Sequence, residues 1–199
     1  MKFNKWLLFL IPIIAILAYF SIPTAKPVEE TGADVLKIRK EKDEAFKEGD
    51  ESPIKDKANF KGLSYYPFNK DYILDFVLEK AEKPKTVALK MTDGSSEKLI
   101  LFGFLKGEIG GFTVSFTLYQ HENGDFFLPF KDKTAPTETY GGGRFLDLPL
   151  TNVKNNRLRV DFNLAYNPYC AYNEDFACPI PPAENTLPIR IEAGEKIFN

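Results

Sequence analysis

From Tyr72 to the C-terminus, apolar and polar residues alternate in short runs, which is typical of strands with one buried face. The clearest runs place a large apolar side chain at every second position, and they cover residues 87–91, 112–119, 157–163 and 187–192. Two other runs, 72–78 and 99–105, are more continuously apolar, so we expect them to be central strands. The pattern predicts about eight antiparallel strands.

Pairs of turn-forming residues separate several of these runs. Asn123-Gly124 is typical of a type I′ hairpin turn, and Asp93-Gly94 and Gly110-Gly111 mark the turns before it. We therefore expect a mainly β fold, either a single antiparallel sandwich or a small, partly closed barrel. The aromatic content of 18 Phe and 9 Tyr agrees with this, because aromatic residues at alternating strand positions fill a core.

The first 23 residues follow a different pattern, with Lys2 and Lys5 preceding an uncharged run from Trp6 to Ile22. A helix of about 25 Å is at the short end for a bilayer, so residues 1–23 are expected to be a signal anchor or transmembrane segment. A cleaved signal peptide is the alternative, although the nearest cut, after Ala25, places a proline where a small residue is preferred.

Both alternatives place the rest of the chain on the extracytoplasmic side of the cell membrane, periplasmic or extracellular. The lipid bilayer would be the partner of residues 6–22 in an anchored protein, and the protein would be secreted if the signal is cleaved.

Residues 24–59 are expected to connect the membrane segment to a β domain at 60–199. Thr31 and Asp34 fit a capping box and Gly49 fits a C-terminal stop, which together predict a helix over residues 32–48. This helix is rich in charge and has few large apolar residues. We therefore expect a short, charged, solvated stalk rather than a helix that binds a partner.

The numbers of charged residues, histidines and cysteines exclude several classes of function. The chain has 26 Lys and Arg against 28 Asp and Glu, so nucleic acid is not an expected partner, because phosphate contacts need clustered basic residues. The chain has one His and two Cys, which excludes zinc sites of four cysteines or of two cysteines and two histidines. We expect no metal and no cofactor, although a site of both cysteines, the histidine and a carboxylate remains possible.

Cys170 and Cys178 lie in a long, proline-rich loop over residues 167–182. A loop of this length usually packs down or has a function. Outside the cytoplasm, two cysteines at this spacing favour a disulfide that holds the loop. Free buried thiols, or a redox or metal-binding pair, are the alternatives.

The segment Tyr140–Arg144 contains three consecutive glycines. Such a segment allows backbone amides to converge on an anion, and Arg144 can bind a carboxylate or a phosphate. However, Phe145–Leu148 continues as a strand and not as a helix, so this is not a nucleotide-binding loop. A bulge or a tight turn is the structural alternative.

Polar and tyrosine side chains around the two loops are candidate ligand contacts. A carboxylate pair among Asp147, Asp161 and Glu184 would suit a cofactor-free hydrolase. Calcium binding is a further use of such groups, whereas hydrogen bonding within the loop would be purely structural. The tyrosines suit a sugar, a partner protein or packing of the loop. The complete candidate set is Tyr140, Gly142, Gly143, Arg144, Asp147, Asp161, Asn163, Tyr166, Asn167, Tyr169, Glu184 and Asn185.

His121 stands beside the Asn-Gly turn and is expected to be exposed. No second histidine and no Gly-x-Ser-x-Gly motif accompanies it, so no catalytic triad is expected.

Several motifs in combination resemble a known family, and they are Phe130–Thr134, Thr139–Asp147, Asp161–Ala171, Cys178–Asn185 and Ala193–Lys196. Over roughly residues 40–198 the chain resembles the bacterial and archaeal domain-of-unknown-function family 1684. The resemblance implies a single domain and directs attention to 140–147 and 161–185. It implies no activity, because that family is itself uncharacterised.

The anchor, the stalk, the strand-rich body and the two irregular loops together predict a membrane-anchored extracytoplasmic binding module. Its partner would be a small ligand, a glycan or a protein of the cell envelope. A hydrolase that uses a carboxylate pair is the alternative from another class, and a purely structural envelope protein is the third. We expect a binding module more than an enzyme.

Overall fold

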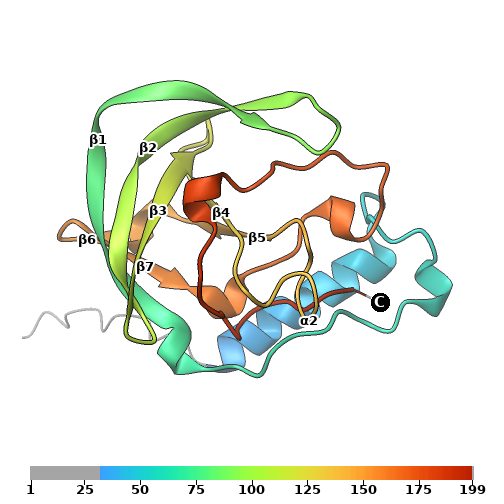
Figure 1. Ribbon diagram of the computed structural model, residues 1–199. Helices are drawn as coiled ribbons and strands as arrows, with labels where there is room; N and C mark the ends of the chain where they lie inside the picture. The colour runs from blue at the N-terminus through green and yellow to red at the C-terminus, as the bar shows by residue number, and fades with distance from the viewer. Residues whose placement is uncertain (1–31, 199) are drawn as a thin grey trace, which may run out of the picture. The chain divides into compact units, whose positions relative to one another are not determined.

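Residues 32–198 are described by the computed structural model, and their strands form one antiparallel sheet in the order β5-β4-β3-β2-β1-β7-β6 (Figure 1). The strands are β1 Ile73–Lys90, β2 Ser96–Ile109, β3 Phe112–Gln120, β4 Phe126–Phe130, β5 Arg144–Leu148, β6 Val153–Lys154 and β7 Arg157–Asp161. The mainly β, antiparallel prediction is confirmed. The prediction of a sandwich or partly closed barrel is wrong, because the seven described strands form one open sheet whose outer strands, β5 and β6, do not pair with each other.

The described residues contain helix α2 Gly32–Glu48 and six short 3-10 helices, η1 Lys57–Asn59, η2 Lys70–Tyr72, η3 Leu150–Asn152, η4 Phe162–Leu164, η5 Tyr169–Ala171 and η6 Ala183–Asn185. None of the helices within residues 32–198 has the length and apolar character needed to cross a membrane. The expected membrane segment over residues 1–23 lies outside the described part of the chain.

The alternating run at 187–192 is buried as predicted but does not form a strand. Leu187, Ile189 and Ile191 are 5%, 7% and 0% exposed, whereas the residues between them face solvent. The segment crosses the residues after β4 and makes single hydrogen bonds, such as Leu187 N to Lys131 O at 2.8 Å. The alternation of apolar and polar residues therefore indicates an extended, half-buried backbone in this segment, but the segment does not pair with a neighbouring strand. This is one reason why the sheet has seven described strands where about eight were expected.

All three predicted turns connect consecutive strands as expected. Gly94 lies between β1 and β2, and Gly110-Gly111 joins β2 to β3 with φ of 57° and 82°. Asn123-Gly124 connects β3 to β4 through the loop 121–125, which is longer than a two-residue type I′ turn. The backbone N–H of His121 closes this loop by donating to Asp125 O at 2.9 Å. The positive φ values typical of a type I′ turn occur at Asn155 and Asn156, between β6 and β7.

Apolar side chains are buried on both faces of the sheet. The larger cluster contains Phe76, Phe116, Leu118, Phe126 and Phe162, together with the extended segment 187–193. The smaller cluster lies on the opposite face of β3, β4 and β5 and contains Leu89, Leu99, Tyr119, Phe127, Phe145 and Cys178. Neighbouring residues in β3 and β4 therefore point into different clusters, which explains why all of β4 is buried.

The predicted helix over residues 32–48 is confirmed as α2, but its description as a solvated stalk is wrong. Val35 and Phe46 are only 1% and 5% exposed. Arg39 is buried as well, and its guanidinium donates to Tyr66 O at 2.8 Å and to Asn163 O at 3.0 Å. Figure 1 shows α2 beside the segments that follow β7 and lead to the C-terminus. The few apolar residues of the helix form one narrow stripe, and that stripe is sufficient to dock it.

Candidate functional site

A mainly apolar cavity of about 760 Å³ lies between α2, strand β5 and the segment after β7. Its apolar wall includes Ile38, Phe46, Phe145, Leu164, Tyr169 and Phe176. Only two charged side chains of the described residues line it, Lys42 and Asp147. A cavity of this size, with an apolar wall and a few polar groups, is the usual form of a small-molecule site.

Tyr166 is placed in the wall by the edge of the sheet. Its backbone N–H donates to Phe145 O at 3.0 Å and its carbonyl accepts from Phe145 N at 2.8 Å, so the segment after β7 covers the free edge of β5. The phenol then reaches two residues along β5 and donates to Asp147 Oδ2 at 2.6 Å. Burial, and secondly the charge of Asp147, raises the pKa of Tyr166, so the phenol remains a hydrogen-bond donor at any physiological pH.

Asp147 also faces His121, whose Nε2 lies 3.6 Å from Asp147 Oδ1. The carboxylate is half exposed, with a side-chain exposure of 51%. The histidine ring packs on Phe127, with 5.0 Å between ring centroids. This end of β5 therefore presents one carboxylate that two fixed side chains hold in position.

Lys42 extends from α2 to the other side of the cavity and forms an ion pair with Glu195 at 2.7 Å. Glu195 is fully buried, and its carboxylate also accepts from Tyr172 and from Asn167 Nδ2 at 3.1 Å. The Lys42 ammonium lies 5.1 Å from the centroid of Tyr166, which is within the range of a cation–π contact. The lysine is thus neutralised and fixed before any ligand arrives.

Aromatic rings form the rim of the cavity. Tyr169 packs edge-on against Phe46 at 5.8 Å and against Phe176 at 5.3 Å between ring centroids. Tyr169 and Phe176 nevertheless keep 41% and 37% of their surface exposed. These two rings give the opening an apolar surface that water wets poorly.

The predicted disulfide does not form in this structure, in which Cys170 and Cys178 are both free thiols. The two residues are nevertheless adjacent, because the Cys170 N–H donates to Cys178 Sγ at 3.1 Å. The hydrogen bond with the Cys178 thiol lowers the pKa of Cys170 to about 7, and that same contact raises the pKa of Cys178. The loop is held instead by backbone bonds, including Thr92 N to Cys178 O at 2.9 Å.

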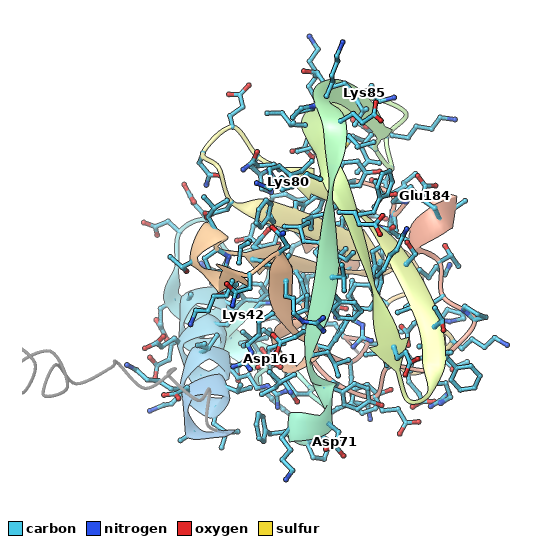
Figure 2. All side chains as sticks on the ribbon, turned by 90° about the vertical axis from the view of Figure 1, so that its left-hand side faces the viewer. Lys42, Asp71, Lys80, Lys85, Asp161 and Glu184 are labelled. Atoms are coloured by element: carbon cyan, nitrogen blue, oxygen red, sulfur yellow. The ribbon has the colours of Figure 1, made fainter. Side chains whose placement is uncertain are left out.

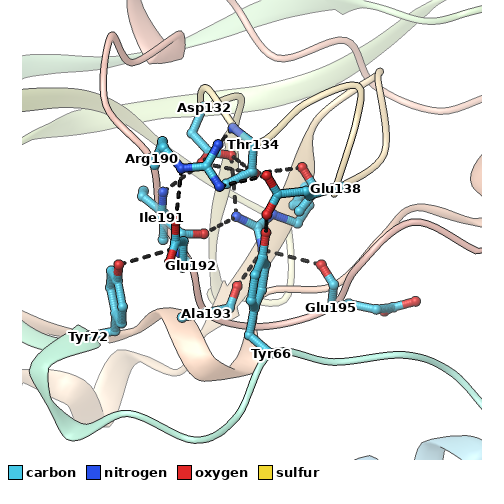
Figure 3. Close-up of polar contacts among 12 residues, drawn as sticks. Tyr66, Tyr72, Asp132, Thr134, Glu138, Arg190, Ile191, Glu192, Ala193 and Glu195 are labelled. Atoms are coloured by element: carbon cyan, nitrogen blue, oxygen red, sulfur yellow. Dashed lines mark hydrogen bonds and ion pairs between the residues drawn. The ribbon is translucent and has the colours of Figure 1, made fainter.

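Arg144 is buried in a polar cluster and does not lie at a surface. Figure 3 shows Asp132, Ile191, Ala193 and Glu195, whose oxygen atoms accept hydrogen bonds from the Arg144 guanidinium. Its side chain is 0% exposed, and it donates to Ile191 O at 2.9 Å and to Asp132 Oδ1 at 3.3 Å. Its Nη1 atom donates to the carbonyls of Ala193 and Glu195. The guanidinium therefore binds the C-terminal segment of its own chain, which leaves it no exposed surface for an external anion.

The glycines before Arg144 form a turn, as the structural alternative predicted. Gly143 N donates to Tyr140 O at 3.0 Å, and Gly143 has φ of +96°, which favours glycine. Gly142 is exposed in the same turn. The Tyr140 hydroxyl points to Cys170 Sγ at 3.7 Å, so it joins the turn to the cysteine loop.

Most of the remaining candidates organise the backbone. Asp161, Asn163 and Asn185 are all buried. Asp161 caps η4, and Asn163 forms hydrogen bonds with both the N–H and the carbonyl of Asn69. Asn185 forms hydrogen bonds with the backbone of Thr117 and Pro129. Asn167 is also buried and donates to Lys196 O at 2.8 Å. Glu184 is exposed in η6, and Figure 2 shows it far from Lys42.

The structure therefore brings three of the predicted ligand contacts to one cavity, Asp147, Tyr166 and Tyr169, together with Cys178 of the predicted disulfide. Sequence reasoning missed Lys42 and Glu195. Lys42 sits in a helix interpreted as a solvated stalk, where a lysine is unremarkable. Glu195 belongs to the motif Ala193–Lys196, which was noted for family resemblance but carried no functional expectation. Within residues 32–198, no group of three or more His, Cys, Asp or Glu side chains is placed to hold a metal ion.

Comparisons with known proteins agree with the fold and add no activity. A family model described as a protein of unknown function, DUF1684, matches residues 58–196. The chain is similar to an uncharacterised protein from Haloarcula marismortui whose solution NMR structure is known. The two share 32% identity and a TM-score of 0.66, and the match covers 82% of this chain and 92% of the other. No curated protein matches the chain.

Proposed function

Since the chain belongs to the DUF1684 family, which is described only as being of unknown function, we propose a function from the cavity described above. The protein binds a small, mainly apolar ligand between α2 and β5. The observation that carries this proposal is the cavity of about 760 Å³ itself, with its aromatic rim and its apolar wall. The volume lies in the range of sites that enclose a small organic molecule.

Preorganisation of the polar groups supports the proposal. Asp147 is held by the Tyr166 hydroxyl at 2.6 Å, and Lys42 is held by Glu195 at 2.7 Å. Side chains whose partners are already in place lose little conformational entropy when a ligand binds. Such fixed groups orient a ligand, while the aromatic rings provide most of the contact surface.

The hydrolase alternative has less support. Its three nominated carboxylates do not share one cavity: Asp147 lines the apolar cavity, Asp161 is buried at the start of η4, and Glu184 is exposed in η6. General acid–base hydrolysis needs two carboxyl groups about 5–10 Å apart in a cleft. Nothing among the described residues favours a glycan over another small ligand.

The test is calorimetric titration of the full chain with 4-phenylbutanol, an uncharged probe with an apolar body. Ala45→Phe places a ring at the wall of the cavity from an exposed position of α2, so it should not disturb the fold. We expect this variant to weaken probe binding by roughly tenfold or more, because the ring occupies the space that the probe needs.

Ala58→Phe is the matched control, because Ala58 is also exposed but lies in η1, outside the cavity lining. It should bind the probe as the parent chain does. Equal affinities for all three chains, or no binding by any of them, would exclude the cavity as a ligand site.

We also propose that residues 6–22 anchor the protein in a bilayer, with the domain on the extracytoplasmic side. The support is the uncharged apolar sequence between Trp6 and Ile22. Extraction of cell membranes with alkaline carbonate should leave an anchored protein in the pellet. Protease added to intact spheroplasts should then digest the domain; full protection with an intact membrane would contradict this orientation.

A further inference from the structure

The charge around the apolar cavity indicates what kind of ligand it would accept, an inference that rests on the proposed function. Of the two charged side chains in the wall, Lys42 has its charge matched by buried Glu195 at 2.7 Å. Among residues 32–198, the one basic side chain that pairs with Asp147 is His121, at 3.6 Å, and it is charged only when protonated. The unmatched fixed charge at this wall is therefore negative.

The aromatic side chains that line the cavity also favour a positively charged ligand. Ring faces carry partial negative charge and attract cations. The cavity already contains one example, since the Lys42 ammonium lies 5.1 Å from the ring centroids of both Phe46 and Tyr166. Tyr169 and Phe176 remain exposed at the rim, where they offer further ring surface.

A second cavity of about 620 Å³ adjoins the first, and Asp147 belongs to the walls of both. Its other carboxylates are Glu97, Glu122 and Asp125, and among the described residues Lys98 is the one lysine or arginine in its lining. The apolar cavity and this second, acidic cavity therefore share one lining residue, Asp147. A ligand with an apolar body and a positive end matches both at once.

We propose that the ligand is a cationic amphiphile, an aryl- or alkyl-ammonium compound. Its apolar body lies in the cavity between α2 and β5, and its ammonium group pairs with Asp147 on the side of the acidic cavity. Binding is non-covalent. The Tyr166 hydroxyl holds the Asp147 carboxylate in place, and the carboxylate accepts a hydrogen bond from the ligand's ammonium group.

The experiment compares three probes with the same body: 4-phenylbutylamine, 4-phenylbutanol and 4-phenylbutyrate. Each is titrated calorimetrically into the full chain at neutral pH and low salt. We expect the amine to bind roughly tenfold more tightly than the carboxylate, because the amine gains an ion pair and ring contacts where the carboxylate meets repulsion. Ala45→Phe should weaken all three probes.

Asp147→Asn removes the charge and retains an oxygen that can accept from Tyr166. We expect the ratio of amine to carboxylate affinity to fall several-fold in this variant but to stay above one, because the aromatic rings and the other carboxylates of the second cavity still favour the amine. Asp93→Asn, in the exposed turn between β1 and β2, removes the same charge elsewhere and should keep the parent ratio.

The outcomes separate the two proposals. If the carboxylate binds as tightly as the amine, or if Asp147→Asn keeps the parent ratio of affinities, the pairing of a cationic ligand with Asp147 is excluded, while binding of 4-phenylbutanol still supports the cavity. If no probe responds to Ala45→Phe, both the cavity site and the cationic ligand are excluded.

Discussion

Lys42 and Glu195 form an ion pair of 2.7 Å that joins helix α2 to the C-terminal segment. Glu195 is fully buried and Lys42 retains 22% of its side-chain exposure, so most of this pair is shielded from water. A helix that the sequence presents as a charged spacer is thereby part of the domain, and it forms one wall of the candidate site.

The first prediction concerns this ion pair. Lys42→Met should lower the free energy of unfolding by about 2–4 kcal/mol, because it leaves the Glu195 carboxylate buried without a cation. The loss should lie below the largest values known for broken buried pairs, since Tyr172 and Asn167 still donate to the carboxylate. Urea denaturation followed by circular dichroism measures it.

Lys37→Met is the matched control. Lys37 pairs with Glu41 at 3.7 Å with both side chains exposed, so its loss should cost less than about 0.5 kcal/mol. Adding Glu195→Gln to Lys42→Met should restore part of the stability by removing the unpaired charge. If the two lysine variants are equally stable, the buried pair has no net effect.

The second prediction concerns Arg144, which the sequence nominated as a ligand contact. Arg144→Lys should destabilise the fold by about 3 kcal/mol or more, because one ammonium cannot reach Asp132 and the three carbonyls that the guanidinium binds. Arg159→Lys, at an exposed pair with Asp75, should change stability by less than about 0.5 kcal/mol. Similar stability of the two variants would show that the buried cluster does not hold the C-terminal segment.

The third prediction concerns the turn before β5. Gly143→Ala should cost about 3 kcal/mol or more, because φ is +96° and a Cβ would lie 2.6 Å from Phe130 O. Gly94 has φ of +85° with nothing within 4 Å of the added atom, so Gly94→Ala should cost only about 1 kcal/mol of backbone strain. The midpoints of thermal unfolding should separate the two variants, and the reverse order would contradict the packing around Gly143.

The fourth prediction concerns thiol reactivity. Because the pKa of Cys170 is lowered to about 7, alkylation by iodoacetamide without reductant should rise with a midpoint near pH 7. Cys178 is 4% exposed and its pKa is raised, so it should react far more slowly. Mass spectrometry of the labelled peptides identifies the modified residue.

Cys178→Ala tests the cause of this shift. The variant removes the thiol whose hydrogen bond lowers the pKa of Cys170, so the midpoint should move upward. The absence of any labelling in the parent chain would show that the two sulfurs are already joined, as the cysteine spacing suggested.

Much of the scaffold could be predicted from the sequence, because alternation and turn chemistry are local properties. The strand runs other than 187–192, the turns at Gly94 and Gly110-Gly111 and the helix over 32–48 all follow from neighbouring residues. The type I′ turn was assigned to the wrong pair, since Asn155-Asn156 lacks the glycine that usually marks such a turn.

The candidate site was harder to predict, because charged and polar residues serve the core as well as the surface. Arg144 and Asn185 stand in conspicuous motifs, and the structure places both at 0% exposure, where they bind carbonyls of their own chain. Asp147 and Tyr166 reach the same cavity only because Tyr166 pairs with the edge of β5. No spacing in the sequence encodes that contact.

The sequence by itself determined the antiparallel β character, the position of the helix over residues 32–48 and the resemblance to the family, since all three depend on local patterns. Tertiary structure alone decided that the sheet stays open, that the 187–192 run is not a strand and that α2 docks on the domain. The physical reason is that partners such as Lys42 and Glu195 lie 153 residues apart, and their desolvation and pairing are settled only when the whole chain has packed.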